Sequence, residues 1–245
     1  MSQQTRAYDD HPPFRYPDYK STVKRSPDKD MVRILRTLSE NTGPGPAMAQ
    51  IAIEQMIGEQ VSVEDADLTT NAGTGQPALG ERIIVTGRVL DEDGRPLPGT
   101  LLEIWQTNAS GRYAHWRESD FPAPLDPNFL GVGQCLTDEG GAYRFTSIKP
   151  GPYPWGNHPN AWRPAHIHFS LMGPTLGSRL VTQMYFENDP LLSLDPIFNA
   201  APEHSRGRMI ATYDHEVTVE NWALGWRWDI VVRGGLATPM DPSPH

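Results

Sequence analysis

The spacing of apolar residues changes near residue 80 and divides the chain into two parts. In residues 1–80, charged residues, proline and glycine interrupt the apolar positions, and only 28–39 and 47–60 have a spacing compatible with a helix. Neither segment carries enough apolar surface to bury a core of its own. We therefore expect residues 1–80 to form an irregular arm that lies on another surface or is partly disordered.

From residue 81 onward the pattern is that of short β-strands. Runs of β-branched and apolar residues alternate with turn sequences such as DEGG, KPGP and NDP. Two runs within 81–108, joined by the turn-rich DEDGRPLPG, predict a β-hairpin. Further strands are predicted at 142–148, 165–172, 179–186, 207–214 and 226–234. The chain is thus predicted to be all-β, with an antiparallel β-sandwich over residues 81–245.

Length and charge limit the possible partners. The 245 residues suffice for one large domain, and the formal net charge of -9 disfavours nucleic acid and anionic membranes as partners. No apolar run approaches the roughly 20 residues that span a bilayer, and the first twenty residues lack the apolar centre of a signal peptide. The single cysteine, Cys135, excludes an intrachain disulfide and is expected to pack within a strand of a cytoplasmic protein.

The segment 151–169, GPYPWGNHPNAWRPAHIHF, concentrates side chains that can carry chemistry. His166 and His168 stand two positions apart on a predicted strand, so both imidazoles project from one face, about 6.5 Å apart at the backbone. This spacing suits one metal ion, although two histidines on a solvated face produce the same pattern. No Asp or Glu occurs in the next dozen residues, so a site of two histidines and one carboxylate is not indicated.

Tyrosine is the candidate for the remaining ligands. A phenolate is a hard anionic donor that suits iron(III) better than zinc or iron(II), and it needs a strongly Lewis-acidic ion to form at neutral pH. Tyr153 lies between two prolines that restrict its backbone, and Tyr113 follows a glycine-containing turn. Taken alone, each tyrosine is more readily explained as a packed aromatic residue whose hydroxyl has a hydrogen-bond partner.

Several segments in a fixed order resemble the intradiol ring-cleavage dioxygenases. These segments are GRYAH, APLDPNF, GVGQCLTDEGGAY, KPGPYPW and WRPAHIHF. The likeness runs from about residue 78 to 234, and YPDYKSTVKRSP at 16–27 extends it into the arm. Within the family the chain is most similar to the β subunits that act on protocatechuate. A series of matched segments is much more specific than an isolated pair of histidines.

The resemblance implies a set of ligands for a non-haem iron(III) ion. Tyr113 and His166 match the equatorial ligands, and Tyr153 and His168 match the axial ligands. A water or hydroxide would complete the five-coordinate site. Arg163 matches the cation that stabilises the substrate as the substrate gains carbanion character.

Further residues are implied around the substrate. Gln183 matches a residue that is hydrogen-bonded near the arginine, and Trp155 matches a wall of the pocket. On the arm, Tyr19 and Arg25 match residues that face the acidic substituent of the substrate.

The implied reaction opens a substituted catechol between its two hydroxylated carbons, with dioxygen as co-substrate. Protocatechuate, converted to 3-carboxy-cis,cis-muconate in the β-ketoadipate pathway, is the expected substrate. Departures from the usual family pattern at 41–77, 116–122 and 190–208 leave 4-sulfocatechol or another substituted catechol as an alternative. The resemblance also implies a homologous α-type subunit, which the arm is expected to wrap.

Two other classes of protein remain open. A non-catalytic sandwich, such as the partner subunit of this family, would keep the fold and lack the four ligands. A zinc hydrolase would need a third nitrogen, sulfur or carboxylate donor near His166 and His168, and it would be colourless.

Overall fold

The computed structural model describes residues 10–13, 15–25, 61–115, 122–173 and 179–241. The helices predicted at 28–39 and 47–60 therefore lie outside the described residues, as does most of the loop at 116–122. Within the described part of the chain, no helix is both long enough and apolar enough to cross a membrane.

Short strands dominate the structure. They are β1 (Arg82–Leu90), β2 (Leu101–Trp105), β3 (Val132–Leu136), β4 (Ala142–Ile148), β5 (Tyr153–Pro154), β6 (Trp162–Arg163), β7 (His166–Met172), β8 (Leu180–Phe186), β9 (Ile210–Tyr213), β10 (Leu224–Arg227) and β11 (Ile230–Val231). The helices are α1 (Thr22–Arg25), η2 (Val63–Ala66), η4 (Leu192–Leu194), α4 (Pro196–Ala200), α5 (Glu203–Arg206) and η5 (Gly207–Met209).

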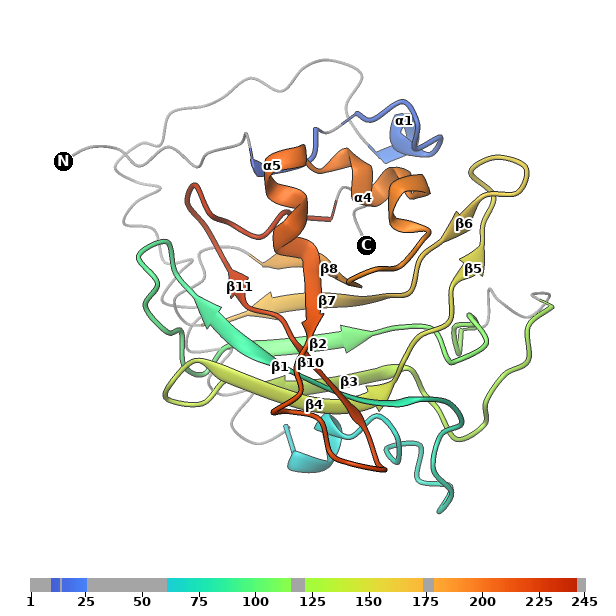
Figure 1. Ribbon diagram of the computed structural model, residues 1–245, viewed down its shortest axis with the longest axis vertical. Coiled ribbons are helices and arrows are strands. Elements are labelled where there is room, and N and C mark those ends of the chain that lie inside the picture. The colour runs from blue at the N-terminus through green and yellow to red at the C-terminus, as the bar shows by residue number, and fades with distance from the viewer. Residues whose placement is uncertain (1–9, 14, 26–60, 116–121, 174–178, 242–245) are drawn as a thin grey trace.

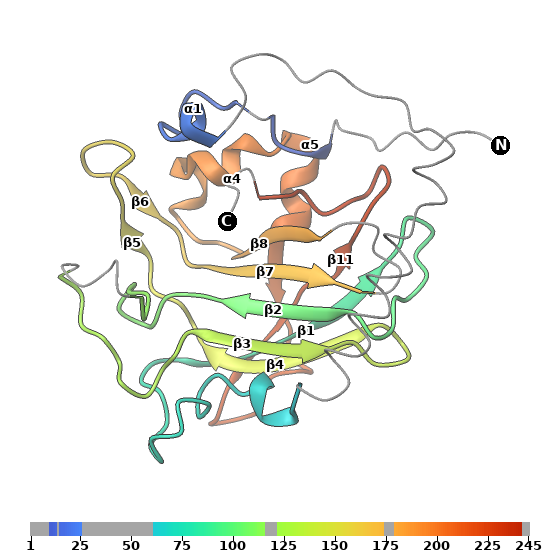
Figure 2. The ribbon, with the colours of Figure 1, turned by 180° about the vertical axis from the view of Figure 1, so that it is seen from behind.

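Nine of the strands form one hydrogen-bonded sheet that folds into two packed layers (Figure 1 and Figure 2). The first layer contains β11, β1, β10 and β4, and the second contains β8, β7, β2 and β3. Strand β9 joins the layers, because it pairs with both β10 and β8. The predicted all-β sandwich is confirmed. Its pairing is mixed, however, since β1 runs parallel to β10 and β11, and β8 runs parallel to β9.

The core lies between the two layers and is rich in aromatic rings. Phe169 of β7 meets Phe145 of β4 at a ring-centroid distance of 5.8 Å and Trp228 at 4.9 Å. Cys135 is buried in β3, as expected, and burial raises the pKa of its thiol to about 12. At neutral pH this cysteine is therefore an inert thiol that contributes only packing. Leu68, from the segment assigned to the arm, is fully buried in the same core.

The predicted β-hairpin within 81–108 is wrong, because its two strands enter different layers. Both edges of β1 are occupied, one by β4 and the other by β10 and β11, so no edge is available to β2. Strand β2 pairs instead with β3 and β7 in the other layer. The turn does form a small local pairing, in which the amide of Leu97 donates to the carbonyl of Val89 at 2.9 Å, before the chain crosses over.

Three of the other predicted strands, at 142–148, 165–172 and 179–186, agree with β4, β7 and β8 to within one residue. The strand predicted at 207–214 is shorter than expected, because its first residues form η5. The strand predicted at 226–234 is divided into β10 and β11. Helices α1, α4 and α5 gather on the β8 side of the molecule in both views (Figure 1 and Figure 2).

Strand β7 is the element that positions the site. All of its residues except Met172 are buried, so both of its faces are covered. Ile167, Phe169 and Leu171 belong to the core between the layers. By the alternation of a strand, His166 and His168 point to the opposite face.

Candidate metal centre

The four predicted ligands come from three parts of the chain and lie close together in the structure. His166 and His168 are neighbours on one face of β7, with ring centroids 4.9 Å apart. Tyr153 begins β5, and its ring centroid lies 5.7 Å from that of His166. Tyr113 lies in the loop after β2, and its ring centroid is 5.8 Å from that of Tyr153. The hydroxyl of Tyr113 is 3.1 Å from Nε2 of His168.

A glycine allows the two tyrosine-bearing segments to approach each other. Gly111 has a φ of +80°, and a Cβ at this position would lie 2.3 Å from the carbonyl oxygen of Pro152. Its amide donates to the carbonyl of Asn108 at 3.0 Å, which closes the turn that leads to Tyr113. Any larger residue at 111 would push the loop away from Tyr153.

His166 is held as a neutral imidazole. Its Nδ1 donates to the carbonyl of Pro164 at 2.7 Å, so the lone pair is on Nε2. Burial, together with the nearby Arg163 and His168, holds the pKa of His166 well below its usual value. The same Nε2 accepts a hydrogen bond from Nη1 of Arg163 at 3.1 Å, which points the guanidinium at the ligand cluster.

The tyrosines fit an ion of high charge. Burial, and next the proximity of Tyr153, raise the pKa of the Tyr113 phenol well above its usual value. This phenol therefore ionises only if a strong positive charge, such as that of iron(III), compensates its burial. Two phenols and two imidazoles together offer a hard ion two anionic oxygens and two neutral nitrogens. Among the described residues, no group of three or more His, Cys, Asp or Glu side chains is arranged so that it could hold a metal ion, as the zinc alternative requires.

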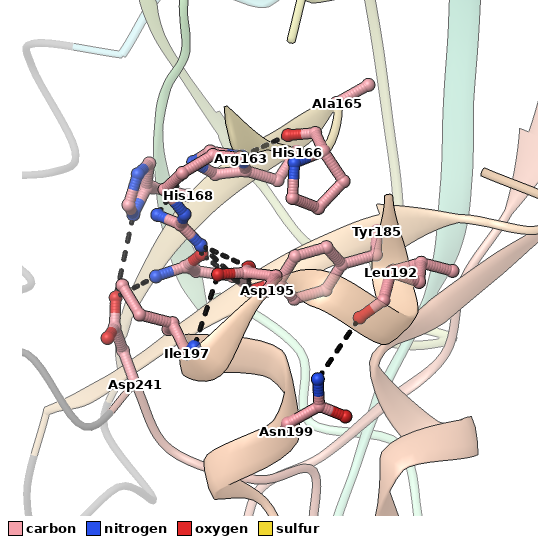
Figure 3. Close-up of polar contacts among 12 residues, drawn as sticks. Arg163, Ala165, His166, His168, Tyr185, Leu192, Asp195, Ile197, Asn199 and Asp241 are labelled. Atoms are coloured by element: carbon pink, nitrogen blue, oxygen red, sulfur yellow. Dashed lines mark hydrogen bonds and ion pairs between the residues drawn. The ribbon is translucent and has the colours of Figure 1, made fainter. Parts of the chain in front are cut away.

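Arg163 lies at the centre of a buried polar network beside the histidines (Figure 3). Its side chain is 3% exposed, and its Nη2 forms an ion pair of 2.9 Å with Asp195, which is fully buried. The same nitrogen donates to Oε1 of Gln183 at 2.6 Å and to the hydroxyl of Tyr185 at 3.0 Å. Gln183 thus lies within hydrogen-bond distance of Arg163 in the structure.

The residues that surround this cluster were not predicted from the sequence. Trp105 at the end of β2 stacks on His168, with centroids 4.9 Å apart and planes within 8°. Tyr185 and Asp195 hold Arg163, and Asp241 lies beside His168. Of these, only Asp195 has a local signal: it precedes a proline and caps α4, since its Oδ1 accepts from the amide of Ile197.

Part of the arm lies at the rim of the cluster. Tyr19 is buried and packs against Trp155 at 5.6 Å, and the Arg163 guanidinium lies 5.8 Å from the centroid of the Trp155 ring. The arm is fixed by Asn157, which accepts from the amide of Lys20 at 2.8 Å and donates to the carbonyl of residue 18 at 2.9 Å. The side chain of Arg25 lies outside the described residues.

Comparison with known proteins agrees with the resemblance seen in the sequence. The family model described as "Dioxygenase" matches residues 56–234, and the model described as "Protocatechuate 3,4-dioxygenase beta subunit N terminal" matches residues 5–34. The protocatechuate 3,4-dioxygenase beta chain of Burkholderia cepacia is 52% identical, over 96% of both chains.

More distant relatives share the fold. A chlorocatechol 1,2-dioxygenase of Rhodococcus opacus is 36% identical, over 50% of this chain and 53% of its own length. The solved structure of 3-chlorocatechol 1,2-dioxygenase from Rhodococcus opacus 1CP has a TM-score of 0.54 at 24% identity, and the match covers 79% of this chain and 82% of that chain. On the strength of the family models and the B. cepacia relative, this chain belongs to the intradiol ring-cleavage dioxygenase family.

Proposed function

We propose that this chain binds non-haem iron(III) and uses dioxygen to cleave protocatechuate between its hydroxylated carbons, giving 3-carboxy-cis,cis-muconate. The observation that carries the proposal is the clustering of two tyrosines and two histidines in a chain 52% identical to a protocatechuate 3,4-dioxygenase beta chain. Tyr113, Tyr153, His166 and His168 would hold the ion. Once bound, the iron would supply Lewis acidity toward the catechol oxygens and the redox capacity for reaction with dioxygen.

Tyr153 is proposed to accept a proton from one substrate hydroxyl. It is half-buried, whereas both histidines are buried, and its strand, β5, contains only two residues. A ligand on such a short ribbon is better placed to move than one in the middle of β7. Positioned proton transfer of this kind typically contributes about 10²- to 10⁴-fold to a rate.

Arg163 is proposed to stabilise negative charge that develops on the substrate. Its Nη2 is occupied by Asp195, Gln183 and Tyr185, which keeps the guanidinium plane fixed. Its Nε–H is buried and has no hydrogen-bond partner within the described part of the chain. A fixed and permanently charged donor in a buried site suits charge stabilisation without taking part in proton transfer.

The preference for one substituted catechol over another is proposed to come from residues at the rim of the ligand cluster. Tyr19, Trp155 and Arg25 would meet the acidic substituent that lies opposite the iron-binding oxygens. The contact between Tyr19 and Trp155, and the guanidinium of Arg163 near Trp155, support this arrangement. 4-Sulfocatechol is the alternative substrate. The segment 190–208, which departs from the usual family pattern, includes η4, α4 and α5. Its Asp195 forms an ion pair with Arg163, so this segment lies beside the proposed substrate site.

A homologous α-type partner is also proposed. The match of residues 5–34 to a beta-subunit model and the B. cepacia beta chain support it. In this proposal residues 1–80 are the arm that reaches the partner and residues 81–245 are the catalytic domain, in a cytoplasmic hetero-oligomer.

A panel of catechol, protocatechuate, 4-sulfocatechol and hydroxyquinol, compared by kcat/KM, tests the proposal. Protocatechuate is expected to exceed catechol by roughly ten- to hundredfold, because a charge-assisted hydrogen bond is worth about 1.5–3 kcal/mol. Tyr19→Phe keeps the ring against Trp155 and removes the hydroxyl, so it should reduce this preference. If catechol is the best substrate, the rim does not bind an anion, and if no muconate forms from any catechol, the proposed reaction is wrong.

A further inference from the structure

Residues 237–241 form a strap that crosses β8 and brings a carboxylate to the ligand cluster. The strap is fixed at several points: the hydroxyl of Thr182 donates to the carbonyl of Pro239 at 2.7 Å, and the amide of Asp241 donates to the carbonyl of Val181 at 2.8 Å. Nη1 of Arg208 also donates to the carbonyl of Ala237 at 2.7 Å. The position of Asp241 is therefore set by contacts that do not involve the cluster.

The carboxylate of Asp241 is fully buried and faces two residues of the site (Figure 3). Its Oδ2 lies 3.6 Å from Nδ1 of His168, and the same oxygen accepts a hydrogen bond from Nε2 of Gln183. Burying a carboxylate costs free energy that must be offset by its contacts. A carboxylate kept there despite this cost indicates a role in the site.

The orientation of His168 shows what that role is. Its Nε2 lies 3.1 Å from the hydroxyl of Tyr113, so this nitrogen faces the ligand cluster, while Nδ1 faces Asp241. The stacked ring of Trp105 fixes the plane of the imidazole. His166 is oriented in a different way, since its Nδ1 donates to a backbone carbonyl that no side-chain substitution can remove.

Gln183 carries the effect of the same carboxylate to Arg163. Because its Nε2 donates to Asp241, its Oε1 is turned toward Nη2 of Arg163, at 2.6 Å, and toward the hydroxyl of Tyr185, at 2.9 Å. A glutamine side chain accepts hydrogen bonds through Oε1 and donates them through Nε2, so a partner at one end also fixes which way the other end points. One buried carboxylate thus faces two side chains of the site, His168 on β7 and Gln183 on β8.

We propose that Asp241 is a positioning residue of the metal centre: it keeps the proton of His168 on Nδ1, so that the Nε2 lone pair faces Tyr113, and it orients Gln183 toward Arg163. This inference rests on the proposed function, because it assumes that His168 is a metal ligand. Outer partners of this kind fix the tautomer and direction of a histidine ligand, and their loss typically weakens metal binding about 10- to 100-fold.

The test uses the full chain with any partner subunit that it requires. In the unsubstituted, iron-free protein, the ¹⁵N side-chain shifts of His168 should show a protonated Nδ1 and a bare Nε2. In Asp241→Ala, which removes the oxygen that faces both His168 and Gln183, this preference should be lost. Competition with an iron(III) chelator should show an affinity about 10- to 100-fold weaker.

Asp91→Ala is the matched control. Asp91 is another mostly buried carboxylate, but its partners are Arg95 and Arg233 at the far end of β1. This variant should lose stability without a change in iron affinity or in the His168 tautomer.

Two results would overturn the proposal: a proton on Nε2 in the unsubstituted protein, or an Asp241→Ala variant that keeps both the tautomer and its iron affinity within about twofold. If the unsubstituted protein takes up no iron, the proposed function fails by itself. The tautomer measurement on iron-free protein still decides the role of Asp241 in that case.

Discussion

Replacing Tyr153 with phenylalanine is expected to leave iron bound and to slow turnover by about 10²- to 10⁴-fold. The variant keeps the ring, which packs edge-on against Tyr113 at 5.8 Å, and removes the oxygen that is proposed to accept the substrate proton. The remaining three ligands include both histidines of the rigid strand β7. Anaerobic mixing with protocatechuate, followed by absorbance, measures the slowed deprotonation directly.

Tyr113→Phe and His166→Ala are the comparison variants. Each removes a donor proposed to stay on the metal throughout the reaction, so each should be purified with most of its iron missing. The imidazole of His166 is also fixed by the hydrogen bond from its Nδ1 to the carbonyl of Pro164, so no other side chain readily takes its place as a ligand. Equal and mild losses at all three positions would contradict the separate role assigned to Tyr153.

Replacing Arg163 with methionine is expected to lower kcat by about 10²- to 10³-fold, the usual effect of removing a donor that stabilises developing charge. The same change should reduce the free energy of unfolding by about 3–5 kcal/mol, because it leaves the fully buried Asp195 without its cation. Urea unfolding and steady-state kinetics measure the two effects separately.

The double variant Arg163→Met/Asp195→Asn separates stability from catalysis. Asparagine retains the oxygen that caps α4 at Ile197 and removes the unpaired charge, so most of the lost stability should return. Activity should not return, because the cation is still missing. Recovery of both quantities together would show that Arg163 acts only through the stability of the fold.

Local patterns predict some elements of this protein well. Strands β4, β7 and β8 were located to within one residue, because their apolar runs are short, clear and bounded by turns. The hairpin prediction was wrong, since a turn sequence does not reveal that both edges of β1 are occupied by strands from distant parts of the chain. Strand pairing of this kind depends on tertiary structure.

The residues of the candidate site were also predictable only in part. Strand periodicity placed His166 and His168 on one face, whereas Tyr113 and Tyr153 were singled out by resemblance to a family. Trp105, Tyr185 and Asp241 were missed, because their roles arise only when β2, β8 and the strap are packed around β7. Nothing in their neighbouring residues distinguishes them from ordinary buried side chains.

Metal analysis combined with visible absorption of the purified protein tests whether the two tyrosines and two histidines bind iron(III). We expect iron in an amount equal to that of the chain, and a red-brown colour from charge transfer between the phenolates of Tyr113 and Tyr153 and iron(III). That colour should change in Tyr153→Phe and should be lost with the iron in His166→Ala. A colourless preparation that contains stoichiometric zinc and still cleaves its substrate would contradict the proposed iron(III) site.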